Sequence, residues 1–246
     1  MKALLRAELI KLRTTRTFVV LTAAALAISL LVVVLTATLQ DEWTEDDARD
    51  LFTTADFTGL FILLLGVMGM AGEWRHRTIT STVLAAPRRL RLLSAKTISY
   101  AVAGIAISLI VTVTIMAIGI LILSARDLPT VGLGDLADGL WRNLVVAAYL
   151  GALGVCIGGL IRNQIVAIVG LLLLTFAIEP AVIGLAPEVG KFGPILGAPN
   201  GFIGLEDSFG EGDEQLTPAV ALLVMIGWVG LAFAAAAARL ERRDLV

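Results

Sequence analysis

The sequence contains little cysteine, little histidine and little charge, and each shortage excludes a class of protein. One cysteine and one histidine among 246 residues exclude a disulfide framework and the clusters of thiols and imidazoles that hold zinc. Charged residues make up 16% of the chain, against about 25% in soluble domains. Hydrophobic residues make up 58%, and the 24 glycines come on top of that figure. This composition excludes disorder, argues against a water-soluble enzyme and indicates a chain that lives in lipid.

A loop that could bind ATP is also missing. The Walker A consensus GxxxxGK[ST] has four residues between its glycines, and its last residue holds magnesium through a hydroxyl group. In the nearest stretch five residues separate Gly184 from Gly190, and Phe192 stands in place of the Ser or Thr. His76 and Cys156 fall in different predicted segments, so they do not suggest a catalytic pair. We therefore expect no cofactor, no metal and no catalytic site in this chain.

Long apolar stretches dominate the sequence instead. A helix needs about 20 apolar residues to cross the hydrocarbon core of a bilayer, and a backbone in lipid must satisfy its own hydrogen bonds. The sequence therefore predicts an all-α membrane protein in which residues 1–246 form one transmembrane domain with six transmembrane helices. The predicted spans are about 18–39, 53–72, 97–125, 143–161, 163–185 and 215–238.

Positive charges are distributed unevenly between the predicted loops. If the N-terminus is cytoplasmic, the inner segments are 1–17, 73–96, Arg162 and 239–246, and they carry 15 of the 19 Lys and Arg residues. The outer segments carry the other four, together with 16 of the 21 acids. Because cytoplasmic loops are enriched in Lys and Arg, both termini are predicted to be cytoplasmic.

Two segments outside the spans have a distinct character. Residues 1–17 place leucines beside a stripe of Lys and Arg, which predicts an interfacial amphipathic helix on the anionic lipid headgroups, or simply a positively charged flank. Residues 179–214 are rich in Pro and Gly yet apolar until Glu206. Broken backbone at membrane depth must be buried in protein or line a cavity. The sequence therefore predicts a re-entrant outer element between the fifth and sixth helices.

Glu179 is the only acid within a span when residues 40–56 are taken as an outer loop. An intramembrane carboxylate is by default a functional hypothesis, so Glu179 is a candidate residue of the substrate path or a proton site. The alternative is that it meets the outer interface or binds backbone groups freed by Pro180.

The fourth span contains closely spaced glycines, including the pair Gly154 and Gly158. Small residues at this spacing let two helices approach closely in lipid. The pattern fits packing within the chain and a dimer interface equally well.

The largest inner segment, 73–96, is longer than a simple connection needs. Its sequence allows a short helix that starts near Thr78 or Thr80 and ends at Pro87, followed by basic residues between leucines. We interpret it as an exposed, basic, structured loop on which a partner docks. Topology and lipid explain its charge, so nucleic acid is not an expected partner.

The order of these features resembles that of the ABC-2 type transporter permeases. The resemblance rests on Glu73–Thr80 (EWRHRTIT) and Leu84–Arg89 (LAAPRR), which look like the first cytoplasmic loop of bacterial members, and on the ending Arg242–Asp244. The basic N-terminal helix, the spans and the broken outer element follow in the same order, so the likeness covers essentially the whole chain.

The resemblance implies a permease of a bacterial plasma membrane that lacks its own ATPase. Two copies of a separate P-loop ATPase would bind ATP and magnesium, and a second permease chain, identical or paralogous, would complete the exporter. The 73–96 loop would supply a coupling helix for the ATPase. Its candidate contact residues are Glu73, Arg75, His76, Arg77, Thr78, Thr80, Thr82 and Arg88. Relatives export drugs, antibiotics, lipids and polysaccharides, and the apolar spans favour a hydrophobic or amphipathic small molecule, as in multidrug efflux.

Two other functions fit the same composition. A stand-alone intramembrane carrier or enzyme would use Glu179, and a non-transporting scaffold or immunity protein would recruit a partner to the membrane. A neighbouring gene for a soluble P-loop ATPase would favour transport.

Overall fold

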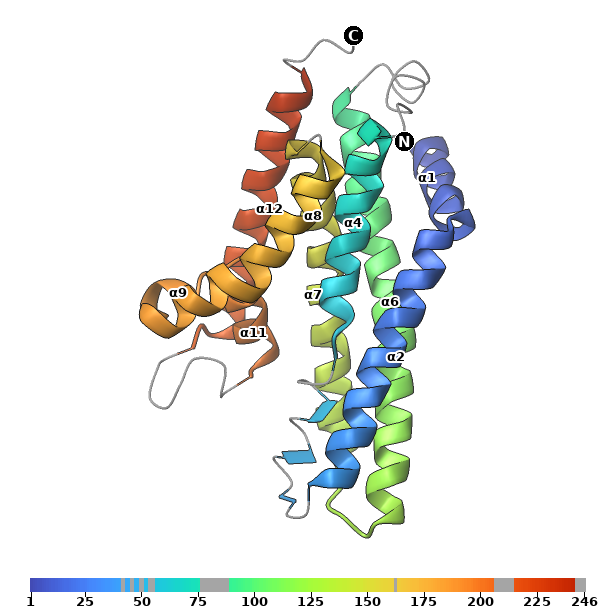
Figure 1. The fold of residues 1–246 in the computed structure, drawn as a ribbon, viewed down its shortest axis with the longest axis vertical. Coiled ribbons are helices and arrows are strands. Elements are labelled where there is room, and N and C mark those ends of the chain that lie inside the picture. The colour runs from blue at the N-terminus through green and yellow to red at the C-terminus, as the bar shows by residue number, and fades with distance from the viewer. Residues whose placement is uncertain are drawn as a thin grey trace.

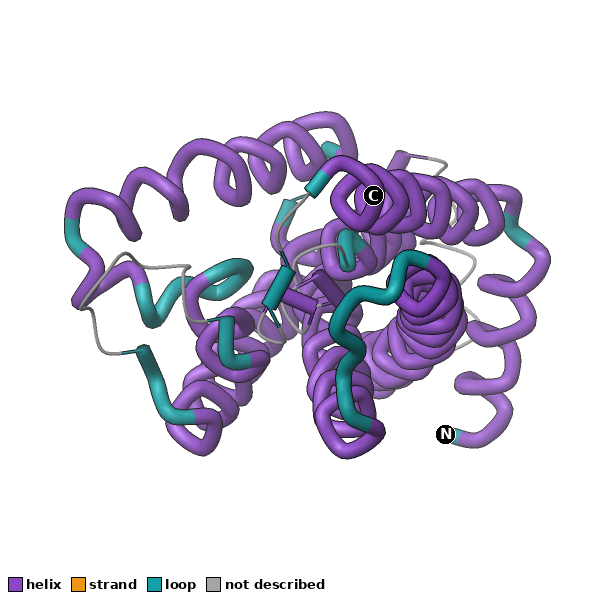
Figure 2. Tube along the Cα trace, turned by 90° about the horizontal axis from the view of Figure 1, so that it is seen from below, coloured by secondary structure: helices purple, strands orange, loops and turns teal. Residues whose placement is uncertain are grey.

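A computed structural model describes residues 1–40, 43–44, 47–48, 51–52, 56–75, 89–161, 163–205 and 215–241. Within these residues every regular element is helical and no strand occurs (Figure 2). The elements are α1 (Lys2–Thr14), α2 (Arg16–Leu39), α4 (Thr58–Arg75), α6 (Arg89–Ala125), α7 (Leu133–Leu160), α8 (Gln164–Leu173), the π-helix η1 (Leu174–Ile178), α9 (Glu179–Leu185), α10 (Pro187–Gly190), α11 (Gly197–Ile203) and α12 (Pro218–Glu241). The prediction of an all-α fold is confirmed for the described residues.

Five helical segments in the described part of the chain are long and apolar enough to cross a membrane. They are α2, α6, α7, the continuous run Gln164–Leu185 and α12. The remaining predicted span, 53–72, overlaps α4, whose 18 residues include the charged Glu73 and Arg75 in the last turn. α4 is not among the five candidates, so five of the six predicted spans correspond to a helix that is long and apolar enough.

The connection between α4 and α6 is shorter than predicted. Residues 73–75 belong to α4 and residues 89–96 to α6, so both ends of the predicted loop are helical. Leu92 and Leu93 are buried, and this burial explains why α6 begins before the apolar stretch does. Residues 76–88 lie outside the described residues.

The long helices form a bundle with the N-terminus and the end of α12 at one pole. The N-terminus and the last turn of α12 lie at the same end of the molecule, next to the end of α4 and the start of α6 (Figure 1). α1 lies at this end too and packs against α6 and α2. An extended residue, Thr15, separates α1 from α2.

α7 is the central helix, and its glycines allow close packing. It contacts α4, α6 and α12. A Cβ atom on Gly154 would clash with the carbonyl oxygen of Leu63 on α4, and one on Gly158 would lie 2.7 Å from that of Val67. The glycine-rich face of α7 therefore packs against α4 within the chain. This is one of the two interpretations of the glycine spacing, the other being a dimer interface.

The segment after α8 bends away from the bundle. The run from α8 to α9 leans outward (Figure 1), and it contains the π-helix, which ends two residues before Pro180. The widened turn of a π-helix accommodates proline, which lacks an amide hydrogen and whose ring would clash with the preceding turn of an α-helix. The chain then returns through α10 and α11, and α11 packs against α12 and α7.

Candidate functional site

A fully buried lysine joins three helices at the end of the bundle where the termini lie. Lys96 on α6 has no exposed surface, and its Nζ lies 2.7 Å from Oε2 of Glu8 on α1 and 3.0 Å from Oε1 of Glu73 on α4. Both carboxylates are buried as well. Lys11, on the more exposed side of α1, donates a second hydrogen bond to Glu73. These four side chains, the ion cluster, carry no net charge and fasten α1 to the ends of α4 and α6.

The ion cluster is held by mutual compensation of buried charges. Removing an ion from water costs several kcal/mol unless a partner compensates it. Burial raises the pKa of Glu73, but Lys96 and Lys11 outweigh that effect and hold the pKa below its ordinary value. Glu73, one residue beyond the predicted span, is therefore ionised near neutral pH.

A pocket of about 460 Å³ opens beside the ion cluster, between α1, α4 and the start of α8. Its polar lining includes Lys11, Glu73, Arg75 and Gln164. Arg75 is exposed at the end of α4, with Nη1 3.5 Å from Oε1 of Gln164. This corner of the bundle thus offers charged groups next to the residues that connect α4 to α6.

The candidate coupling residues fall into three groups. Glu73 is 3% exposed, so the expectation of an exposed loop is wrong at this position, because the side chain turns inward to Lys96. Arg75 is exposed as expected. The remaining candidates, His76, Arg77, Thr78, Thr80, Thr82 and Arg88, lie outside the described residues. Sequence reasoning missed Lys96 and Glu8, since both were counted only as charges of inner segments.

Glu179 binds backbone amides of the broken segment. Its carboxylate accepts hydrogen bonds from the backbone N–H groups of Ile195, with N to Oε1 at 2.9 Å, and of Leu196, with N to Oε2 at 2.5 Å. The side chain is buried. These amides come just before α11, so Glu179 fastens the returning chain to α9. The hydroxyl of Tyr149 on α7 donates to the carbonyl of Pro194 at 2.6 Å and holds the same turn. These contacts give Glu179 a structural role. Its partners are the amides of Ile195 and Leu196, and not the backbone groups freed by Pro180 that the sequence suggested.

A second acid lies between the helices. Asp56, just before α4, accepts hydrogen bonds from the hydroxyl of Thr112 on α6 at 2.6 Å and from Nδ2 of Asn143 on α7 at 3.2 Å. Glu179 is therefore not the only acid whose side chain lies among the helices. Asp56 was assigned to the outer loop because it precedes the apolar run, although the Asp-Phe-Thr sequence is a helix-capping signal.

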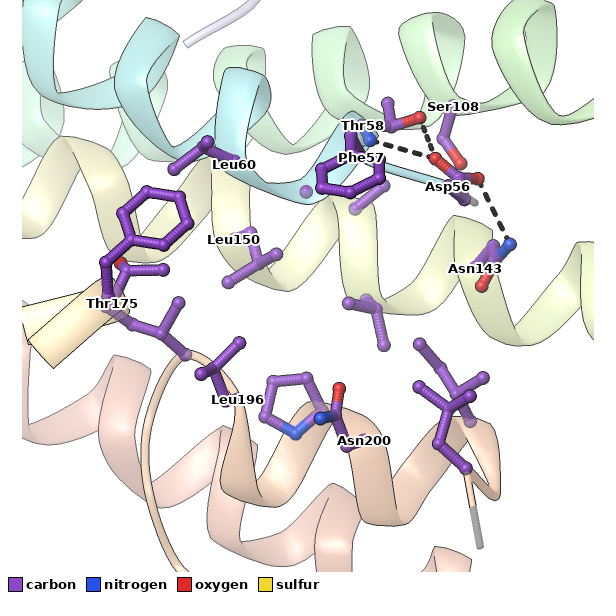
Figure 3. Close-up of a pocket in the computed structure, with 18 residues that line it drawn as sticks. Asp56, Phe57, Thr58, Leu60, Ser108, Asn143, Leu150, Thr175, Leu196 and Asn200 are labelled. Atoms are coloured by element: carbon purple, nitrogen blue, oxygen red, sulfur yellow. Dashed lines mark hydrogen bonds between the residues drawn. The ribbon is translucent and has the colours of Figure 1, made fainter. Parts of the chain in front are cut away.

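Asp56 lines a pocket of about 330 Å³ between α4, α7, η1 and α11. Figure 3 shows Asp56, Ser108 and Asn143 together at one end, with Leu60, Leu150 and Leu196 along the pocket. The pocket thus has a polar end and largely apolar walls. Among the described residues, no three His, Cys, Asp or Glu side chains gather in a way that could hold a metal ion.

A family model matches most of the chain. The model of a family described as "ABC-2 family transporter protein" matches residues 4–178, which covers α1 to η1 and ends one residue before Glu179. No curated protein matches the chain at a significant level.

Proposed function

The chain belongs to the ABC-2 family of transporter proteins, and we propose that it is the membrane-spanning permease subunit of an ATP-driven exporter. A separate P-loop ATPase, present in two copies, binds ATP and magnesium and docks on the connection between α4 and α6. A second permease chain completes the working unit, which lies in a bacterial plasma membrane. The cargo is a hydrophobic or amphipathic small molecule.

The observation that carries the proposal is the attachment of three helices to one another beside the docking connection. Residues 76–88 join α4 to α6, so a partner that displaces them pulls on the ends of both helices. Lys96 links these ends through Glu73 and links both to α1 through Glu8. A movement at the connection is therefore transmitted to α1, α4 and α6 together rather than absorbed by one of them.

Charge and topology support a cytoplasmic position for this end of the bundle. It contains the N-terminus, the end of α12 and both flanks of the connection (Figure 1), and the corresponding segments hold most of the Lys and Arg residues. The ATPase, which needs cytosolic ATP, would meet the chain here.

The outer faces of α2 and α12 support contact with lipid and with a second permease chain. Val20 and Leu31 on α2 and Leu223 and Leu231 on α12 are exposed apolar residues. In a membrane such faces contact acyl chains or another apolar helix.

The role of Arg75 in coupling is tested by charge reversal. Arg75→Glu places a negative charge at the end of α4 without entering the ion cluster, and we expect transport per ATP hydrolysed to fall about tenfold, equivalent to ~1.4 kcal/mol of lost coupling. The measurement compares ATP hydrolysis and cargo export by the reconstituted complex.

Lys2→Glu is the matched control, because Lys2 is exposed on α1 at the same end of the bundle. It makes the same change of charge away from the connection and should leave the ratio of export to hydrolysis unchanged. Equal ratios in both variants and the native chain would remove Arg75 from the coupling surface.

A further inference from the structure

The pocket between α4, α7 and α11 contains the carboxylate of Asp56, whose hydrogen-bond partners among the described residues are all neutral. Asp56 accepts hydrogen bonds from the amide and hydroxyl of Thr58, the hydroxyl of Thr112 and the side-chain amide of Asn143. No basic side chain in the described part of the chain forms an ion pair with Asp56. Arg142, next to Asn143, is paired with Asp138 at 2.8 Å. Among the described residues, the carboxylate of Asp56 is therefore not neutralised by an ion pair.

Helix capping does not account for this charge. The Oδ1 atom of Asp56 lies 2.9 Å from the amide nitrogen of Thr58, as expected of a residue that caps α4. Asn or Ser caps a helix about as well as Asp does, and either would avoid placing a carboxylate in the pocket. The partial positive charge at a helix N-terminus, about half a unit, offsets only part of the negative charge.

The carboxylate lies along the helices rather than at their tips. Asn143 is ten residues after the first residue of α7, and Thr112 is 13 residues before the last residue of α6. At about 1.5 Å per residue these separations are ~15 and ~20 Å. An ionisable group between membrane helices is by default a functional hypothesis, as part of a path for a substrate or ion.

The pocket has the size and lining of a small-molecule site. Its volume of about 330 Å³ falls in the range of ligand pockets, roughly 300–1,000 Å³. Phe57, Leu150 and Ile195 are among its apolar lining residues, while Ser108 and Asn143 lie near Asp56 at one end (Figure 3). An apolar body fits the walls, and a positive group fits the polar end.

We propose that this pocket binds an amphipathic monocation, whose charged group faces Asp56 while its apolar part lies between α7 and α11. Calling this cation the cargo rests on the proposed transport function, but its binding does not. The attraction is electrostatic, because each carboxylate oxygen of Asp56 already accepts two hydrogen bonds from the protein. A quaternary cation has no N–H group to donate, so it can bind without a further hydrogen bond.

A pair of ions with the same shape and opposite charge tests the proposal. Equilibrium dialysis with the purified chain in a neutral detergent measures binding of radiolabelled tetraphenylphosphonium and, in separate samples, of radiolabelled tetraphenylborate. We expect tetraphenylphosphonium to bind saturably and tetraphenylborate to bind at least tenfold more weakly. Equal binding of the two ions would overturn the proposal.

Substitutions assign the binding to Asp56. Asp56→Asn should weaken cation binding at least tenfold, whereas Asp135→Asn, which removes an equal charge from an exposed position on α7, should leave it unchanged. Unaltered binding by a folded Asp56→Asn variant would overturn the assignment.

A second variant decides the question if Asp56→Asn does not fold. Asn200 on α11 lines the pocket from the side opposite α4, and Asn200→Asp adds a negative charge without altering Asp56. We expect tighter binding of tetraphenylphosphonium, and unchanged or weaker binding would contradict a site that selects by charge.

The binding assay also separates this proposal from the transport function. Charge-selective binding by a chain that associates with no ATPase would support the cation site and contradict the proposed exporter function. An assembled, ATP-hydrolysing exporter that binds neither ion would retain the transport function and remove the cation site.

Discussion

Replacing Lys96 by Met is the most informative perturbation of the ion cluster. Methionine has a similar length and no charge, so the change removes the positive group while nearly filling the same space. Glu8 then loses its ion pair, and Glu73 keeps only the bond from Lys11. A carboxylate is left buried without compensation between α1 and the bundle.

The expected cost follows from burial. Removing one partner of a buried ion pair destabilises a protein by about 3–5 kcal/mol. Lys11→Met removes a pair whose lysine side chain is 47% exposed, and exposed pairs contribute only about 0–1 kcal/mol. The two substitutions delete the same chemical group from the same cluster, so the difference between them isolates the effect of burial.

The assay is unfolding of the purified chain in mixed micelles, monitored as a function of denaturing detergent. We expect Lys96→Met to lower the free energy of unfolding several times more than Lys11→Met does. In the double variant Lys96→Met/Glu8→Gln, part of the loss should be recovered, because the uncompensated charge is gone. Equal stabilities of the two single variants, or no recovery in the double variant, would refute the role given to the buried pair.

The remaining predictions concern the outer segment and the packing of α7. Glu179→Gln keeps an acceptor for the amides of Ile195 and Leu196 but loses the charge-assisted part of these hydrogen bonds. Hydrogen exchange of the two amides should therefore accelerate, while transport should change less than in Arg75→Glu. Complete loss of transport in a normally assembled complex would instead make Glu179 a site residue. Gly154→Ala should destabilise the chain by about 1–3 kcal/mol, because the added methyl group is forced against α4, and Gly170→Ala, whose methyl group meets nothing within 4 Å, serves as the control in the same unfolding assay. Similar stabilities of the two alanine variants would contradict the close contact of α7 with α4.

Local patterns were sufficient to predict the helical architecture. A run of 20 apolar residues must be helical in lipid whatever surrounds it, and α2 and α12 cover the first and last predicted spans closely. Helix ends were less predictable, because they depend on tertiary burial. α6 extends back to Arg89 since Leu92 and Leu93 pack inside the bundle, which the hydropathy of the segment alone does not indicate.

The ion cluster and the Asp56 pocket could not be derived from charge counts. Glu8 and Lys96 are 88 residues apart in the sequence, and the topology argument treats each as a charge of its own segment. Pairing across such a separation depends on how α1 docks on the bundle. Asp56 was assigned by its place before an apolar run, and only its contacts with α6 and α7 reveal that it lies between the helices.

The central claim, that this permease is driven by a separate ATPase, is tested most directly by purification from native membranes. A tag on the C-terminus and a mild detergent would recover the chain with whatever it binds. The account predicts a stoichiometric P-loop ATPase that is lost when residues 76–88 are replaced by a neutral linker of equal length. A chain that is stable, elutes alone and hydrolyses no ATP would contradict the account.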